Sequence, residues 1–451
     1  MENVDTSIFK AYDIRGVYPT QINAELVYKI AQAYVKFIGP KTVAVGYDMR
    51  LSGKEFSEAA IKGLTDAGVN VVDIGLTSTD QLYFAAATLP VDGGIQITAS
   101  HNPKEYGGLK MVREKGKPIS GDSGIYEIRD LVVSEKWKVE SEKKGAVEKR
   151  DVAKDYFNHV LSKFNISKIK PFKIVANPNF GMSNPSIEYL KNILPVKFVS
   201  VIYGQLDGNF PKGRPDPLVL ENRSETIEAV KEFKPDLGVA WDADADRCFF
   251  FDEHGEFVTP AYISALLAKY YLQKYPGSKI LHDTRVVRVI DAAVSENGGV
   301  SVMNKAGHSF IKERMMLDDI VFGCETSGHY FFKDNFYLDN GLFPLLGMLE
   351  ILSEESEPFS ELLKPLREKF YISEEINFKF DNQNILEDIK AKYKDAKIDN
   401  VDGYDFNYPD WRFNVRRSNT ENLLRINLEA NSAELLKEKT EEVSKLINEI
   451  K

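Results

Sequence analysis

Short apolar segments alternate with amphipathic segments along most of this 451-residue chain, and that alternation limits the possible folds more than any other feature. Residues 69–74 are rich in β-branched side chains, which favour strands. Just before them, Phe56, Ala60 and Leu64 recur at helical spacing on one face. Strands that alternate with helices are typical of α/β domains. The expected strands are residues 42–45, 69–74, 95–98, 173–176, 196–202, 237–241, 279–282, 301–303 and 320–323.

The helix between the first two strands has recognisable end signals. Ser52 is placed to begin it, and Glu55 follows three residues later, which is the spacing of a capping box. Gly68 is placed to end it, since glycine often occupies the left-handed position after a helix. Further helices are expected at residues 183–194, 223–233 and 261–274.

The last segment follows another pattern. Strands are expected at residues 376–380, 412–416 and 423–428, and helices at 384–393 and 432–450. Consecutive strands with flanking helices indicate an α+β domain. The charged stretch at 134–151 marks the boundary after the first α/β part. We therefore predict three α/β domains and a C-terminal α+β domain, spanning residues 1–148, 149–250, 251–368 and 369–451.

Charge, hydropathy and cysteine content exclude several classes of protein. The net charge of −10 does not favour binding to nucleic acid or to anionic lipid. The most apolar stretch, residues 342–352, is too short to span a bilayer and is interrupted by Pro344, Gly347 and Glu350. The N-terminus lacks the basic start and apolar run of a signal peptide. With only two cysteines in the chain, we expect a cytoplasmic protein with no nucleic acid and no membrane partner.

Three aspartates follow the predicted strand at 237–241. In an extended chain Asp242, Asp244 and Asp246 would point to the same side, because side chains alternate along a strand. Carboxylates so close repel one another unless a cation lies between them, and oxygen ligands suit magnesium or calcium rather than zinc. The alternative is an acidic turn on the surface.

A serine follows the predicted strand at 95–98. Ser100 lies in a loop restrained by Pro103, at the carboxyl end of a strand, where open α/β sheets bind ligands. It is therefore a candidate nucleophile, and the alternative is an ordinary strand-to-loop turn. No Gly-x-Ser-x-Gly elbow is present, and His101 is too near in sequence to serve easily as a triad base.

Several other polar residues lie beside small or turn residues. Arg15, Lys110 and Arg416 could bind phosphate oxygens, although each could equally be a solvated charge. The loop at residues 323–329 offers a carboxylate, hydroxyls and an imidazole that could bind sugar hydroxyls, and the alternative is a plain polar loop. His308 could likewise either bind the sugar or be an ordinary polar residue of a loop.

In this order, these segments resemble the α-D-phosphohexomutase family from Tyr12 to Thr420. The run Thr-Ala-Ser-His-Asn-Pro around Ser100 resembles the phosphoserine loop of that family, and residues 242–247 resemble its metal loop. Residues 323–329 resemble its sugar-binding loop, and residues 416–420 resemble its phosphate-binding loop.

The resemblance implies a fold and a reaction. The fold is three related α/β domains with mixed sheets and a C-terminal α+β domain like the TATA-box-binding protein, around a central cleft. The reaction is intramolecular phosphoryl transfer, in the isomerase class, with a phosphorylated Ser100 and a hexose 1,6-bisphosphate that is both intermediate and activator. The resemblance also implies Mg²⁺ as the cofactor, with Ser100, Asp242, Asp244 and Asp246 as its ligands.

The resemblance further assigns residues to roles. The catalytic candidates are Ser100, His101, Lys110, Arg15, Arg247 and His329. Either Lys110 or His329 could be the general acid or base. The substrate-binding candidates are Tyr12, Arg285, His308, Glu325, Ser327, Arg416, Ser418, Asn419 and Thr420.

The run Arg-x-Ser-Asn-Thr-Glu after residue 415 resembles phosphomannomutases and enzymes that also act on glucose phosphates. The implied activity is interconversion of mannose 1-phosphate and mannose 6-phosphate by a monomer or homodimer. Within the family, the alternatives are a phosphoglucomutase and a phosphoglucosamine mutase. Outside it, the alternative is a sugar-phosphate phosphatase, which would need no clamp for a second phosphate.

Overall fold

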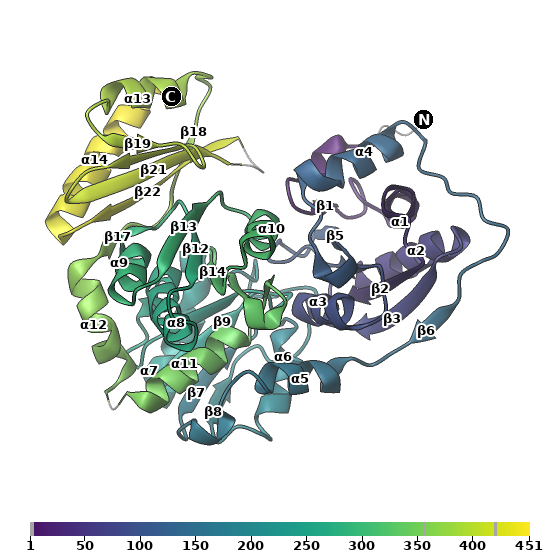
Figure 1. Cartoon of the computed structure of the whole chain (residues 1–451), viewed down its shortest axis with the longest axis horizontal. Helices are drawn as coiled ribbons and strands as arrows, with labels where there is room; N and C mark the ends of the chain where they lie inside the picture. The colour runs from purple at the N-terminus through teal and green to yellow at the C-terminus, as the bar shows by residue number, and fades with distance from the viewer. Residues whose placement is uncertain (1–3, 356, 419–421) are drawn as a thin grey trace. The chain divides into compact units, whose positions relative to one another are not determined.

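A computed structural model of the chain describes residues 4–355, 357–418 and 422–451. These residues form two compact units. Figure 1 labels helices and strands of both. The first contains the described residues up to Val258 and those from Ser327 to 355. The second contains Thr259–Thr326 and the described residues from Glu357 onward.

The first unit begins with a mixed sheet. In spatial order its strands are β1 (Ile14–Val17), β5 (Tyr106–Arg113), β4 (Gly93–Ile97), β2 (Thr42–Tyr47), β3 (Asn70–Leu76) and β6 (Val147–Lys149). β2 pairs parallel with β3 and β4, and β3 pairs parallel with β6. β5 pairs antiparallel with β1 and β4, which makes the sheet mixed as predicted.

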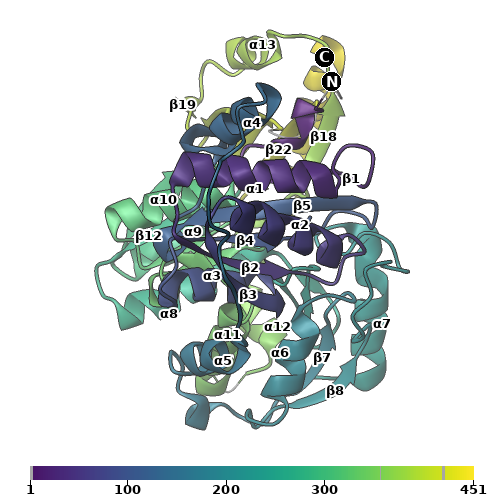
Figure 2. The ribbon, with the colours of Figure 1, turned by 90° about the vertical axis from the view of Figure 1, so that its right-hand side faces the viewer.

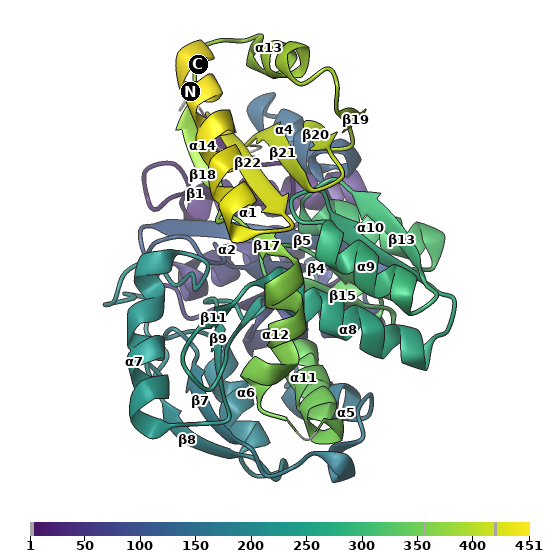
Figure 3. The same cartoon turned by 90° about the vertical axis from the view of Figure 1, so that its left-hand side faces the viewer.

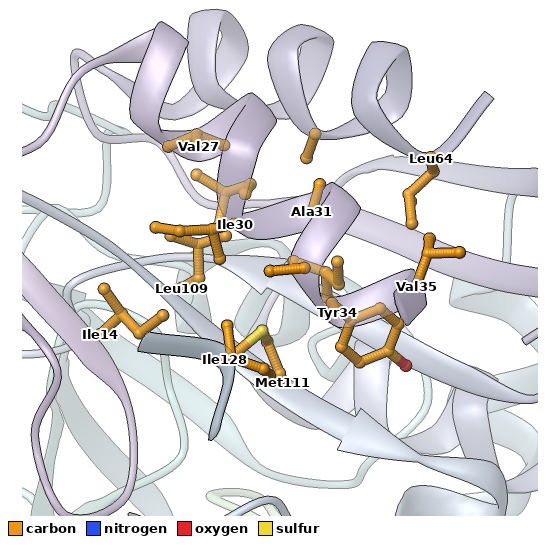
Figure 4. Close-up of a cluster of buried hydrophobic side chains, with 14 of the residues drawn as sticks. Ile14, Val27, Ile30, Ala31, Tyr34, Val35, Leu64, Leu109, Met111 and Ile128 are labelled. Carbon is orange, nitrogen blue, oxygen red and sulfur yellow. The ribbon is translucent and has the colours of Figure 1, made fainter. Parts of the chain in front are cut away.

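Helices cover both faces of this sheet. On one face α1 (Ala24–Ile38), α2 (Gly53–Asp66) and α4 (Ile125–Val133) share one apolar core with alternate residues of the strands. On the other face α3 (Thr79–Thr88) packs on residues such as Ala44 and Val72. Figure 2 shows α1 and α2 along the sheet, and Figure 4 shows Ile30 of α1 next to Leu109 of β5.

The rest of the first unit contains a second mixed sheet and a hairpin. In spatial order the strands of the sheet are β11 (Phe257–Val258), β10 (Cys248–Phe251), β9 (Leu237–Trp241), β7 (Lys173–Asn177) and β8 (Lys197–Val201). β7 pairs parallel with β8 and β9, whereas β10 pairs antiparallel with β9 and β11. The hairpin consists of β15 (Tyr330–Phe332) and β16 (Leu338–Asp339). The helices here are α5 (Ala153–Leu161), α6 (Ser183–Leu190), α7 (Ser224–Phe233) and α11 (Phe343–Glu354).

The second unit combines parallel and antiparallel strands. β12 (Lys279–Asp283) pairs parallel with β13 (Val300–Asn304) and β14 (Phe322–Cys324). The helices of this part are α8 (Pro260–Lys274), α9 (Arg288–Glu296), α10 (His308–Asp318) and α12 (Phe359–Lys369).

An antiparallel sheet ends the chain. In spatial order its strands are β17 (Tyr371–Ile372), β22 (Leu423–Ala430), β21 (Trp411–Arg417), β20 (Tyr404–Asn407) and β19 (Lys397–Asp399), and β18 (Ile376–Lys379) also pairs with β22. Its helices are α13 (Ile385–Lys392) and α14 (Ala433–Ile450). Figure 3 shows α14 along β22, where Val443 and Ile447 are buried in a core with Phe413 and Leu428. Three α/β parts and an α+β part confirm the predicted fold class.

Two local expectations are wrong. Ser52 does precede α2, but its side chain forms no capping hydrogen bond. Its torsions (φ −81°, ψ −9°) are already helical, whereas a capping residue has extended torsions that direct its oxygen at the free amides. The predicted helix at 183–194 is also too long, because α6 ends at Leu190. Among the described residues, none of the helices combines the length and apolar character needed to cross a membrane.

A buried polar contact links three segments of the first unit. The Tyr156 hydroxyl in α5 donates to Asp80 Oδ2 in α3 at 2.5 Å and accepts from Asn340 Nδ2 at 3.0 Å. Burial raises the pKa of Asp80 to about 7, and hydrogen bonds from Ser78 and Tyr156 oppose that shift. Since this pKa is higher in the folded chain than the ordinary value of 3.8, ionisation of Asp80 lowers stability as pH rises between about 4 and 7.

We expect Tyr156→Phe to lower the free energy of unfolding by about 1–3 kcal/mol, because it leaves buried polar atoms without a partner. The loss should be larger at pH 8 than at pH 5, since the hydroxyl then donates to an ionised carboxylate. Urea unfolding at the two pH values measures both effects. Tyr18→Phe is the control, because the Tyr18 hydroxyl bonds to the exposed Glu55. Equal losses in the two variants would contradict this account.

Candidate active site

Two loops of the first unit lie at the carboxyl ends of parallel strands. Ser100 follows β4, and Asp242 follows β9 directly. In open α/β sheets this edge is where ligands bind. The structure brings the two loops together, because Ser100 Oγ donates to Asp242 Oδ2 at 3.3 Å.

Ser100 has an unusual backbone conformation. Its φ of +48° lies in the left-handed region, which residues other than glycine rarely adopt. Its amide donates to Thr98 Oγ1 at 2.8 Å, and its own Oγ lies 3.0 Å from His101 Nδ1. The contact with His101 differs from our expectation that the adjacent imidazole would be poorly placed as a base.

The three aspartates converge, although not in the expected way. One carboxylate oxygen from each of Asp242, Asp244 and Asp246 lies within 4.8 Å of the others, and all three residues are buried. The segment is a turn rather than an extended strand end, and Ala245 has a φ of +68°. The extended geometry that we predicted is therefore wrong. The tight turn directs the carboxylates to one point.

The electrostatics of this cluster favour a cation. Burial raises the pKa of Asp242, and the negative charges of Asp244 and Asp246 raise it further. Asp244 Oδ1 is buried and has no hydrogen-bond partner in the part of the chain that the structure describes. Three converging carboxylates with a free oxygen fit a divalent metal ion of the oxygen-preferring kind.

Lys110 balances part of this charge. Its Nζ lies 2.7 Å from Asp244 Oδ2 and forms a second ion pair with Asp246. Burial alone would lower the pKa of Lys110, but the two carboxylates outweigh burial and raise it well above its usual value. Lys110 is therefore charged at neutral pH.

Other predicted catalytic residues surround the two loops. Arg247 Nε donates to Asp242 Oδ2 at 3.0 Å, and Arg15 Nη1 donates to Asn102 Oδ1 at 2.7 Å. His329 Nε2 lies 3.4 Å from Asp246 Oδ1. The structure thus gathers Ser100, His101, Lys110, Arg15, Arg247 and His329 within the first unit.

Residues 323–329, which we treated as one sugar-binding loop, contribute to both units. Ser327 belongs to the first, where its Oγ lies 2.9 Å from His329 Nδ1. Glu325 belongs to the second, where its Oε1 accepts from the Gly307 amide at 2.9 Å and lies 3.1 Å from Arg285 Nη2. Of the other substrate-binding candidates, Tyr12 lies in the first unit and the buried His308 begins α10 in the second.

Arg416 lies on β21 in the second unit and is buried. Its Nη2 lies 3.4 Å from Glu375 Oε2, and its Nε has no hydrogen-bond partner among the described residues. Burial lowers the pKa of Arg416, and the charge of Arg285 lowers it further. A buried guanidinium with a spare donor is suited to an anion. Ser418 directly follows β21, whereas the predicted Asn419 and Thr420 lie outside the described residues.

Comparison with known proteins places the chain in a family. Family models match all four parts in order: the phosphoglucomutase/phosphomannomutase alpha/beta/alpha domain I at residues 6–138, domain II at 154–255, domain III at 259–370 and the C-terminal domain at 375–446. A phosphomannomutase from Vibrio cholerae is 42% identical over 99% of both chains. The chain belongs to the α-D-phosphohexomutase family. The predicted resemblance is confirmed.

Two further relatives of this phosphohexomutase are similar over nearly their full length. A Xanthomonas campestris protein named as phosphohexose mutases is 41% identical over 97% of this chain and 98% of its own. A crystal structure of a phosphoglucomutase/phosphomannomutase family protein from Burkholderia thailandensis superposes with a TM-score of 0.89 at 33% identity, covering 98% and 97% of the two chains. As a member of this family, the chain is a phosphoryl-transferring mutase.

Sequence reasoning missed several residues that hold this phosphohexomutase site together. Asp283, at the end of β12, accepts from Arg285 Nε at 3.0 Å and from the Thr326 amide at 2.8 Å. Asp283 therefore positions both Arg285 and the loop that carries Glu325. The sequence does contain a signal for this role, because Asp283 ends a strand and lies two residues before Arg285. Arg50 also lies beside the Ser100 loop, and nothing in its local sequence indicated that contact.

We expect a divalent cation to stabilise this phosphohexomutase through the aspartate cluster. At about 100 times the dissociation constant, Mg²⁺ should add about 2.7 kcal/mol to the free energy of unfolding. Asp244→Asn should lower the affinity at least about tenfold, which removes about 1.4 kcal/mol of that gain. Thermal unfolding over a Mg²⁺ titration measures both.

Asp252→Asn is the matched control, because Asp252 is equally buried in the same unit and lies outside the cluster. It should change the basal melting temperature and leave the increment from Mg²⁺ intact. The same increment in Asp244→Asn as in the wild-type chain would rule out the cluster as the metal site.

Proposed function

We propose that this phosphohexomutase is a phosphomannomutase that interconverts mannose 1-phosphate and mannose 6-phosphate, and that it also acts on glucose phosphates. The reaction passes through a phosphorylated Ser100 and a hexose 1,6-bisphosphate, which also serves as activator. The observation that carries the proposal is the position of Ser100 Oγ, 3.3 Å from Asp242 in a buried cluster of three carboxylates. The names of the relatives support the choice of mannose.

The first step moves the phosphoryl group from Ser100 to a free hydroxyl of the hexose phosphate. The bond from phosphorus to Ser100 Oγ breaks and a bond to the sugar oxygen forms, while the proton of that hydroxyl goes to a base. Lys110 and His329 are the two candidates, and both lie beside Asp246. Because the ion pairs of Lys110 keep it charged, His329 is the better proton acceptor.

Positively charged residues of the first unit offset the negative charge of the transferring phosphoryl group. Arg15 and Arg247 donate to the transferring phosphoryl, and His101 orients the Ser100 oxygen. Asp242, Asp244 and Asp246, with Ser100, would hold Mg²⁺, which draws negative charge away from the phosphoryl group when it is bound.

The second step returns the other phosphoryl of the bisphosphate to Ser100 after the sugar has turned. The bond from phosphorus to the sugar oxygen breaks, the bond to Ser100 Oγ forms again, and the base returns its proton to the freed sugar oxygen. Substrate recognition at both stages is assigned to Tyr12, Arg285, His308, Glu325, Ser327 and a phosphate clamp formed by Arg416, Ser418, Asn419 and Thr420. Glu325 and Ser327 hold the 3- and 4-hydroxyls. The sugar differs between mannose and glucose only at the 2-hydroxyl, so we expect activity on both.

The remaining assignments belong to the same proposal. We place the enzyme in the isomerase class, in the cytoplasm, as a monomer or homodimer with domain boundaries near residues 148, 250 and 368. A phosphoglucomutase or phosphoglucosamine mutase is the nearest alternative, and parallel assays on the corresponding 1-phosphates separate the three. A phosphatase is disfavoured, because the buried Arg416 has a spare donor suited to a second phosphate.

We expect Ser100 to accept one phosphoryl group from hexose 1,6-bisphosphate. Intact mass should rise by one phosphoryl in the wild-type chain and stay constant in Ser100→Ala. Thr98→Ser is the control. It should gain one phosphoryl group as the wild-type chain does, since it retains the hydroxyl that accepts from the Ser100 amide. Phosphoryl release to water without mannose 6-phosphate formation would indicate the phosphatase instead.

We expect Arg416→Ala to weaken binding of hexose phosphate and bisphosphate by about ten- to a hundredfold, because a charged hydrogen bond contributes about 1.5–3 kcal/mol. The variant should also depend more on added bisphosphate, which escapes before it turns. Arg417→Ala is the matched control, since Arg417 is the next residue of β21 and is exposed. Equal Michaelis constants and bisphosphate dependence in the two variants would show that Arg416 is not the clamp.

A further inference from the structure

Arg50 is a buried arginine that bonds to the backbone of the Ser100 loop. Its side chain is 1% exposed. Its Nη1 donates to the carbonyl oxygens of Pro103 at 2.9 Å and Tyr106 at 3.2 Å. Its Nη2 donates to the carbonyl oxygens of Ser100 and, at 2.6 Å, Asn102. One guanidinium therefore holds four carbonyls of the loop that carries the nucleophile.

The other contacts of Arg50 fix its own position. Asp48 Oδ1 accepts from the Arg50 amide at 2.9 Å, and Asp48 Oδ2 lies 3.5 Å from Arg50 Nε. The guanidinium also lies 5.0 Å from the centre of the Phe210 ring, which is cation–π distance. Burial raises the pKa of Asp48 to about 6, and the charge of Arg50 opposes that shift. At neutral pH the pair is a buried ion pair with little freedom to move.

The Ser100 loop needs such a restraint. Ser100 adopts a φ of +48°, which is disfavoured for a residue with a side chain. The four carbonyls converge with their negative ends on one point, and without a cation they would repel one another. A planar guanidinium with five donors can satisfy all of them, whereas a lysine has one small charge centre.

We propose that Arg50 is a positioning residue that holds the Ser100 loop in the conformation from which Oγ faces Asp242. The Arg50 guanidinium donates to the carbonyl oxygen of Ser100, and the Ser100 hydroxyl donates to Asp242 Oδ2 at 3.3 Å. Among the described residues, the hydrogen bonds from the Arg50 guanidinium to the loop all go to backbone oxygens, so its effect on transfer passes through the placement of Ser100. The kinetic consequence of this inference rests on the proposed mutase function.

Arg50→Met and Arg50→Lys test the role, with Arg223→Lys as the matched control. Arg223 is also buried in the first unit and also donates to backbone carbonyls, those of Pro217 at 3.0 Å and Leu218 at 2.5 Å. Three experiments are carried out on folded protein. The first measures the rate of Ser100 phosphorylation by hexose 1,6-bisphosphate, the second kcat and KM for mannose 1-phosphate, and the third hydrogen exchange of the Asn102 and Tyr106 amides.

We expect Arg50→Met to slow phosphorylation and kcat about a hundredfold, since a displacement near 1 Å can cost that much. KM should change less than about threefold, because Arg50 is buried against the loop backbone and is not one of the proposed substrate-binding residues. The two amides should exchange faster. The phosphorylation rate, kcat and amide exchange of Arg50→Lys should lie between those of wild type and of Arg50→Met. If Arg50→Met does not fold, Arg50→Lys is the variant that tests the proposal. Arg223→Lys should retain kcat and the exchange rates.

Two results would overturn the proposal. One is wild-type kcat in folded Arg50→Met, or in Arg50→Lys if Arg50→Met does not fold, with unchanged amide exchange. The other is an equal loss of kcat in Arg223→Lys, which would show a general effect of removing a buried arginine. If the wild-type chain accepts no phosphoryl group at all, the proposed function fails. Amide exchange then decides the role of Arg50 alone: faster exchange supports the clamp, and unchanged exchange rejects it.

Discussion

The burial of three carboxylates in one turn is the constraint on which the rest of the first unit depends. Removing an ion from water costs several kcal/mol even after the protein relaxes, so each carboxylate needs a positive partner nearby. Lys110 on β5 supplies one, and Arg247 on the aspartate loop supplies another. Two cations do not neutralise three carboxylates, which leaves a demand for a further positive charge. Phosphorylation of Ser100 would increase that demand by about 1.5 to 2 charges.

This balance also explains how segments distant in sequence are joined. Lys110 and Asp244 are 134 residues apart; Lys110 lies on β5 of the first sheet, and Asp244 lies in the turn after β9 of the second. The Thr79 hydroxyl at the start of α3 donates to Asp244 as well. The charges of the aspartate loop therefore attach the first sheet to the second through their strand-end loops. The loop that carries the nucleophile is joined to the aspartate loop in the same way, because Ser100 Oγ donates to Asp242.

Buried charged side chains also join segments that are distant in sequence in the second unit. Asp283 holds Arg285 and Thr326, while Arg412 donates to the carbonyl of Thr284 at 2.8 Å and to Glu429 Oε2 at 2.6 Å. Arg412 and Arg416 are four residues apart on β21 and so face the same side of the sheet. One face of β21 thus anchors to the segment beside Arg285 and also presents the proposed phosphate clamp. β21 therefore carries both Arg412, which anchors the strand, and Arg416, which is proposed to bind phosphate.

Much of this arrangement was predictable from the sequence where the signal is local. The aspartates and Ser100 stand out because they follow apolar strands, and the chemistry of a hydroxyl and of carboxylates can be recognised from the sequence alone. Arg50 was not recognisable, since its partners are carbonyls 50 to 56 residues away and any arginine can donate to a carbonyl. The left-handed conformation of Ser100 was equally hidden, because serine seldom adopts it. The division of residues 323–329 between two units depends on long-range packing that no spacing rule describes.

The allocation of residues to the two units agrees with what a mutase must do. Every group assigned to the transferring phosphoryl lies in the first unit, where buried ion pairs fix its position. Arg285, His308, Glu325 and Arg416, which are assigned to the sugar and the distal phosphate, lie in the second. In the proposed mechanism the two half-reactions at Ser100 are the reverse of each other, and the sugar is presented in opposite orientations. In the proposed mechanism one rigid reacting centre serves both half-reactions, while the proposed recognition groups are divided between the units, with Tyr12 and Ser327 in the first. A single rigid pocket around the whole ligand would favour one orientation and retain the bisphosphate instead of letting it turn.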